Sequence, residues 1–167
     1  MNHPFLSRKS KICIYKTIIR PTVTYAAETW TITANNERIL GGWERKILRK
    51  IFGPVCENGD WRIRTNREKY QLYQDVDIVT LIKTSRLRWA GHVKRMEDER
   101  ACKKIFEGKP EGRRRRGRPR KRWQDDVEED LKRLGVRGWR RKARDRAEWK
   151  KVVFHVRALQ GLTSSNK

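Results

Sequence analysis

The chain has 167 residues, with 43 Lys and Arg against 20 Asp and Glu, and its formal net charge is +23. A free globular domain gains nothing from such self-repulsion, so the charge indicates a polyanionic partner, most simply a phosphate backbone. An apolar fraction of 36% argues against one large core, whereas seven Trp, four Tyr and four Phe argue against a fully disordered chain.

The first predicted helix covers residues 7–20 and begins at a cap, Ser7 or Ser10. Its apolar face is formed by Ile12, Tyr15 and Ile19. Pro21 is expected to end this helix or to open another, because proline has no N–H to donate. Residues 22–30 fit a short helix or an extended segment.

A longer helix is predicted over 34–52. Its apolar residues, spaced three, four and four apart, are Leu40, Trp43, Ile47 and Ile51. Gly53-Pro54 stops it, and 53–64 is expected to be a loop. Thr65-x-x-Glu68 fits a capping box that opens a helix over 66–74.

Asp77 is expected to cap the clearest helix of the sequence. One face of that helix is lined by Ile78, Ile82, Ser85, Trp89, Val93 and Met96. A short helix over 98–107 should end at Gly108. No stretch has a convincing period of two, so no strand is predicted.

Residues 108–122 lack apolar side chains apart from proline, and like charges at this density predict a disordered linker. A helical hairpin follows at 123–160. Its first helix carries Trp123, Val127, Leu131 and Leu134, and its second, over 139–159, carries Trp139, Ala143, Trp149, Val153 and Val156. The predicted fold is therefore all-α: a helical region at 7–107, the basic linker, and the hairpin.

The basic linker is the main candidate for nucleic-acid binding. Residues 100–122 hold 12 Lys and Arg and two acids. Arg116-Gly117-Arg118-Pro119-Arg120 has the pattern of an AT-hook, whose extended backbone lies in the A·T minor groove. Sequence-tolerant binding to RNA or DNA phosphates, minor-groove reading, and a solvated linker or nuclear-import signal remain open.

The predicted nucleic-acid contacts combine this linker with basic neighbours on the helix at 78–96. They are Arg113, Arg114, Arg115, Arg116, Arg118, Arg120, Lys121, Arg122, Arg86, Arg88, Lys94 and Arg95. Trp89 and Trp123 lie among basic residues and could stack on unpaired bases. The competing interpretation is that tryptophans at helical spacing belong to the core.

No catalytic constellation is found. The sequence shows no carboxylate, Ser or Cys at a spacing from His3, His92 or His155 that indicates catalysis. The acids at 125–130 are expected to cap a helix and balance charge. Three distant cysteines predict neither a zinc site nor a disulfide framework. No apolar run is long enough to span a bilayer, and no secretory signal is evident.

Several stretches taken together resemble the C-terminal region of endonuclease–reverse transcriptases of retrotransposons that lack long terminal repeats. They are Tyr15-Lys-Thr-Ile-Ile-Arg-Pro21, Tyr25-Ala-Ala-Glu-Thr-Trp30, Glu44-Arg-Lys-Ile-Leu-Arg-Lys-Ile-Phe-Gly53, Leu87-Arg-Trp-Ala-Gly-His-Val93 with Arg95-Met96, and Gly117-Arg-Pro-Arg-Lys-Arg-Trp123 with Asp126. The resemblance covers about residues 7–155, and one departure is Tyr25-Ala26-Ala27, where the family often has Tyr-Gly-Ala.

The resemblance implies a thumb-like helical part that grips template and primer, followed by a basic segment that holds element RNA or target DNA. It implies no catalysis by this chain and no cofactor, because the Tyr/Phe-Ala-Asp-Asp motif that binds magnesium in an intact family polymerase is missing. RNA or DNA is the expected partner, with no membrane and no small-molecule substrate, and a nuclear location is favoured over a cytoplasmic one. The alternative is a DNA-binding regulator, with a helix-turn-helix at 123–156 and the hook-like segment in the minor groove.

Overall fold

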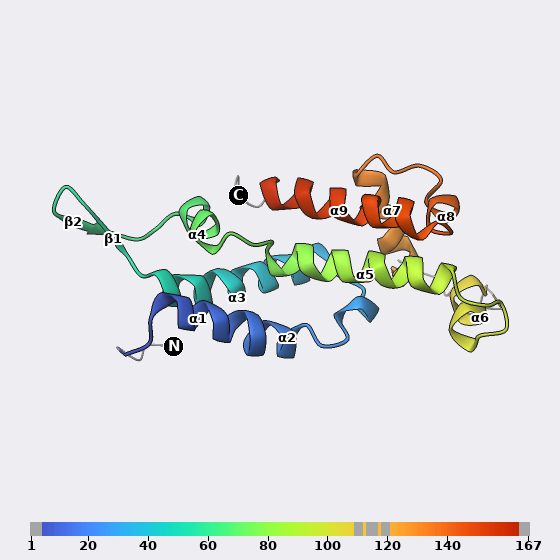
Figure 1. Cartoon of the computed structure of the whole chain (residues 1–167), viewed down its shortest axis with the longest axis horizontal. Coiled ribbons are helices and arrows are strands. Elements are labelled where there is room, and N and C mark those ends of the chain that lie inside the picture. Colours follow the sequence, from blue (N-terminus) through green and yellow to red (C-terminus); the bar gives the residue numbers. More distant parts are fainter. Residues whose placement is uncertain (1–4, 109–111, 113–116, 118–120, 164–167) are drawn as a thin grey trace. The chain divides into compact units, whose positions relative to one another are not determined.

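The chain is predominantly helical, as predicted, in a computed structural model that describes residues 5–108, 112, 117 and 121–163 (Figure 1). It divides into two compact units. Unit 1 contains the described residues among 1–26, 33–82 and 157–167, and unit 2 contains those among 27–32 and 83–156. These units do not coincide with the predicted segments 7–107 and 123–160. The reason is that residues 83–107 share a core with the C-terminal helices.

Unit 1 begins with one continuous helical stretch. It consists of α1 (Arg8–Ile14), a π-helical turn η1 (Tyr15–Ile19) and α2 (Arg20–Val23). Ser7 is the N-cap and accepts the Ser10 N–H at 3.1 Å. Pro21 does not end the helical stretch; it lies in the first turn of α2, in line with the predicted alternative that it opens another helix. The Arg20 N–H donates to the Tyr15 carbonyl five residues back, and this wider turn accommodates proline without ending the helix.

Helix α3 (Ala34–Phe52) matches the predicted range and is capped by Thr33, which accepts the Asn36 N–H. Its most buried face is not the predicted one: the predicted residues other than Ile51 are only half-buried. The fully buried positions are Gly41, Glu44, Leu48, Ile51 and Phe52. The face is rotated because the helix buries a carboxylate within its stripe, which a purely apolar pattern does not reveal.

That carboxylate, Glu44, is held by three hydrogen-bond donors of unit 1. It accepts the Tyr15 hydroxyl at 2.7 Å, the Tyr70 hydroxyl at 3.2 Å and the Ile78 N–H at 3.0 Å. Burial raises the pKa of Glu44 even though the three donors act in the opposite direction. Burial and the neighbouring Glu44 likewise raise the pKa of Tyr15. Glu44 therefore joins α1–η1, α4 and the start of α5 around the small core of unit 1.

The segment after α3 corrects the prediction of a loop without strands. β1 (Val55–Glu57) and β2 (Asp60–Arg62) form an antiparallel hairpin in which Cys56 pairs with Trp61. Asn58 and Gly59 have φ values of +53° and +91°, so an Asn-Gly turn connects the strands. This dipeptide favours two-residue hairpins even where the strands are too short to show a period of two.

Helix α4 (Asn66–Tyr73) confirms the predicted capping box. Thr65 accepts the Glu68 N–H, and Glu68 accepts the Thr65 N–H at 2.7 Å. Helix α5 (Ile78–Lys94) confirms the cap at Asp77, which accepts the Thr80 N–H at 2.6 Å. Two local sequence signals thus fixed where these helices begin.

Unit 2 is built around the second half of α5. The other elements are η2 (Ala27–Thr29), α6 (Ala101–Glu107), α7 (Trp123–Arg133), α8 (Trp139–Lys142) and α9 (Arg146–Thr163), the last of which continues beyond the unit. The core residues are Leu87, Ala90, Val127, Leu131, Trp139, Ala143, Trp149, Val153 and Val156. The predicted single helix over 139–159 is split, because the Asp145 side chain accepts the Ala147 and Glu148 N–H groups and starts α9 anew.

Gly91 allows the closest approach in this core. A Cβ built on Gly91 would lie 2.0 Å from Nε1 of Trp149, whose N–H donates to the Leu87 carbonyl at 3.0 Å. Gly91→Ala is therefore expected to lower the free energy of unfolding by about 1–3 kcal/mol, despite the better helix propensity of alanine.

Gly42→Ala in α3 is the matched control. Its nearest neighbour would be the flexible end of Arg45 at 3.9 Å, so stability should rise by up to about 1 kcal/mol. Urea unfolding followed by circular dichroism measures both variants. Equal effects at the two glycines would show that contact with Trp149 does not decide the outcome.

Candidate nucleic-acid interface

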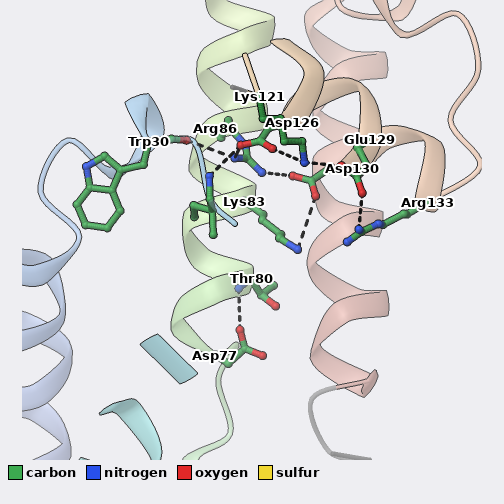
Figure 2. Close-up of polar contacts among 11 residues, drawn as sticks. Trp30, Asp77, Thr80, Lys83, Arg86, Lys121, Asp126, Glu129, Asp130 and Arg133 are labelled. Carbon is green, nitrogen blue, oxygen red and sulfur yellow. Dashed lines mark hydrogen bonds and ion pairs between the residues drawn. The ribbon is translucent and has the colours of Figure 1, made fainter. Parts of the chain in front are cut away.

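Arg86 anchors unit 2 from inside. Its side chain is buried, and Nη1 donates to Oδ2 of Asp126 at 2.9 Å and to the Trp30 carbonyl at 3.3 Å (Figure 2). Its Nη2 donates to Oδ2 of Asp130. Arg86 is therefore a structural residue, and the predicted phosphate contact is corrected. The residue faces away from solvent because two carboxylates one helical turn apart on α7 satisfy its charge.

The same carboxylates bind further groups. Asp126 accepts the Ile32 N–H at 2.9 Å and pairs with Lys121 at 2.5 Å, whereas Asp130 lies 3.6 Å from Nζ of Lys83. Burial works against the charge on Lys121, but hydrogen bonds to Asp126 and Glu129 outweigh it and raise the pKa of Lys121. This buried network therefore ties α5, α7 and the chain around Trp30 together (Figure 2).

The remaining acids of α7 serve the roles predicted for them. Asp125 accepts the Arg122 N–H at 2.9 Å and thereby caps the helix. Glu128 pairs with Arg140, and Glu129 pairs with Arg133 and Lys121. Within the described ranges, no three His, Cys, Asp or Glu side chains gather as metal ligands. The acids of α7 are thus engaged in capping and in neutralising nearby cations.

Trp123, the first residue of α7, is held in a defined orientation. Its indole N–H donates to the Glu28 carbonyl at 2.7 Å, and its ring meets Phe106 edge-on with centroids 5.6 Å apart. The next side chain, Gln124, donates to the Phe106 carbonyl. These contacts fix the start of α7 against α6 and the Glu28 segment.

A hollow of about 420 Å³ opens beside Trp123, and we call it the aromatic pocket. Its lining residues are Thr29, Trp89, Val93, Cys102, Ile105, Phe106, Gly108, Arg122, Trp123 and Gln124. Trp89 also lines a neighbouring hollow of about 280 Å³ together with Arg88 and His92. Trp89 and Trp123, the two tryptophans predicted to stack on bases, are half-buried, and both line this pocket. Trp139 and Trp149, in contrast, are core residues.

The Lys and Arg residues that were predicted to contact nucleic acid differ in exposure and in their partners. Arg88 and Arg122 are exposed, and neither makes an ion pair with the described part of the chain. Lys94 pairs with Glu107. Arg95 donates to the Ala143 carbonyl at 2.7 Å, and burial together with the nearby Arg146 lowers the pKa of Arg95. Arg113, Arg114, Arg115, Arg116, Arg118 and Arg120 of the predicted linker lie outside the described residues, whereas its last two residues, Lys121 and Arg122, make the contacts given above.

A second basic surface surrounds the two core tryptophans Trp139 and Trp149 in the sequence. Residues 137–151 contain eight Lys and Arg and two acids, and one of those acids, Asp145, is engaged as the cap of α9. The exposed cations are Arg137, Arg140, Arg141, Arg144, Arg146, Lys150 and Lys151. Because Arg95 lies beside this α8–α9 surface, cations there repel one another and favour an anionic partner.

Comparisons with known proteins give one informative relative. The chain is 27% identical over 153 residues to an uncharacterised transposon-derived protein of Caenorhabditis elegans. The match covers 87% of this chain and 54% of that protein, so the chain spans about half the length of its relative. No family model and no solved structure matches. Across the described residues, no helix combines the length and apolarity needed to cross a membrane.

Proposed function

We propose that this chain is a nucleic-acid-binding part of a retrotransposon reverse transcriptase and has no polymerase activity of its own. The observation that carries the proposal is the unequal use of charge in unit 2. The acids of α7 are engaged in capping, in the buried network or in surface ion pairs, whereas Arg88, Arg122 and the α8–α9 surface remain exposed. Such a surface binds phosphates and releases their counterions.

Similarity to a transposon-derived protein supports the mobile-element part of the proposal. The reverse-transcriptase part rests on the sequence motifs from Tyr15 to Trp123. The motif from Leu87 to Val93 contains Gly91, and the close contact with Trp149 explains why a glycine is needed there. The Asp125-Asp126 pair does not stand in for a polymerase motif, because it follows Trp-Gln and Asp126 is buried against Arg86.

Fluorescence anisotropy with the full chain tests the proposal. Single-stranded RNA, single-stranded DNA and random duplex of equal length are titrated between 50 and 200 mM salt. We expect binding to all three, with affinity falling steeply as salt rises. No binding to any strand at 50 mM salt would refute the proposal.

The same titrations test the alternative of a DNA-binding regulator. Such a protein prefers its specific duplex over non-specific DNA by roughly 10³-fold or more. We expect random duplexes to compete equally. Competition by one sequence alone, selected from a random pool, would favour the regulator.

A further inference from the structure

We infer that the aromatic pocket binds one unpaired nucleobase, so that the chain distinguishes single-stranded from fully paired nucleic acid. The inference deepens the proposed function and rests on it. It names a site and a ligand class, whereas the exposed cations by themselves imply only a phosphate backbone.

The volume and lining of the pocket suit an aromatic ligand. Trp89 and Trp123 come from different helices, α5 and α7, and Phe106 of α6 stands edge-on to Trp123. The volume of about 420 Å³ falls within the range of small-ligand sites. Every base has a π-face, so stacking on indole rings accepts any base.

The pocket is prepared in advance rather than assembled by the ligand. Trp123 is fixed by its hydrogen bond to the Glu28 carbonyl, and Asp126, one turn further along α7, is held by Arg86. Ile105 on the pocket wall is nevertheless 81% exposed. An apolar wall that the described residues leave open is what a stacking ligand would cover.

Charge around the pocket selects a nucleotide over a neutral apolar ligand. Arg122 lines the pocket and Arg88 lines the adjoining hollow, and both are exposed. A strand whose phosphates are bound by Arg122 and Arg88 therefore has its bases close to the indole rings.

Pairing is expected to exclude a base from the pocket. A base within a duplex must leave its stack before it can enter, at a cost of a few kcal/mol, whereas an unpaired base needs no such step. The pocket thus explains why a single strand would be preferred over a duplex that carries the same charge per phosphate.

Cysteine protection tests the inference on the unmodified chain. Cys102 lines the pocket, and Cys13 and Cys56 in unit 1 are exposed internal controls. Alkylation by N-ethylmaleimide is followed by mass spectrometry with a 12-nucleotide single strand, or an abasic strand of equal length, at ten times its dissociation constant. The natural strand should slow Cys102 alkylation roughly tenfold, while the abasic strand leaves it nearly unchanged.

Substitutions give an independent measurement. Trp89→Ala should weaken binding of the natural single strand about fivefold or more and leave binding of the abasic strand unchanged. Trp123→Phe, which keeps a ring but cannot donate to the Glu28 carbonyl, should weaken binding of the natural strand less than Trp89→Ala does. The control is Trp61→Ala, because Trp61 is 73% exposed on the β-hairpin of unit 1 and should affect neither strand.

The outcomes separate this inference from the proposed function. If natural and abasic strands bind equally and protect Cys102 equally, the base pocket is refuted while phosphate binding stands. If Trp89→Ala weakens both strands to the same degree, the tryptophan serves folding and the inference also fails. If neither strand binds, the inference and the proposed function fail together.

Discussion

Replacing six arginines of the basic segment by glutamine should sharply reduce the salt dependence of nucleic-acid binding. The six are Arg113, Arg114, Arg115, Arg116, Arg118 and Arg120. Each phosphate contact contributes about 0.9 to the slope of log affinity against log salt on duplex DNA and about 0.7 on a single strand. If all six contact phosphates, the slope should fall by about 5 on duplex and about 4 on a single strand.

The structure decides which cations the variant should spare. Lys121 pairs with Asp126 and Glu129, and the side chain of Arg122 lines the aromatic pocket. Replacing Lys121 would disturb the frame of the pocket, and replacing Arg122 would change its lining, so both residues are kept. The variant keeps the side chains of Lys121 and Arg122 and every contact named above, so a change in slope reports on phosphate contacts.

An arginine-to-lysine variant at the same six positions is the matched control. It keeps the charge, so its slope should equal that of the unmodified chain, whereas an AT-hook contact would lose affinity for A·T duplex because it needs guanidinium groups. A glutamine variant whose slope changes by less than about one would show that the basic segment contacts no phosphate.

The helix boundaries that could be predicted depend on chemistry within a few residues. Thr65 and Glu68 form their capping box, and Asp77 caps α5, because each cap satisfies N–H groups in the next turn. The Asn58-Gly59 turn is equally local, but the two strands it joins have only three residues each and are too short to show a period of two. Asp145 was missed for a related reason: the apolar pattern continues across it into α9.

The candidate site shows where local patterns stop being sufficient. Arg86 and Arg88 look alike in the sequence, yet one is buried against α7 and the other is exposed. The difference lies in Asp126 and Asp130, about 40 residues away, and no periodicity links them to Arg86. Likewise, Trp89 and Trp123 line the pocket, whereas Trp139 and Trp149 lie in the core. The difference depends on which helices pack around each ring.

The second large effect is expected at Arg86 itself. Arg86→Met removes the cation that Asp126 and Asp130 share and leaves two buried carboxylates short of a partner. Removing one member of a buried ion pair costs about 3–5 kcal/mol. Against a typical total stability of roughly 5–15 kcal/mol, the urea midpoint of unit 2 should fall substantially. Arg133→Met is the control: Arg133 is largely exposed and pairs with Glu129, so its loss should cost at most about 1 kcal/mol.

A triple variant identifies the cause of that loss. If the damage in Arg86→Met comes from uncompensated charge, adding Asp126→Asn and Asp130→Asn should make the protein more stable than Arg86→Met alone, although two more native side chains are gone. If the damage came only from lost packing, the added substitutions would lower stability further. The distinction matters for the pocket, since Asp126 also holds the Ile32 N–H close to the segment whose Glu28 carbonyl orients Trp123. The triple variant removes the unpaired charges but does not rebuild the hydrogen bonds of the network. It should therefore regain stability and still discriminate poorly between natural and abasic strands.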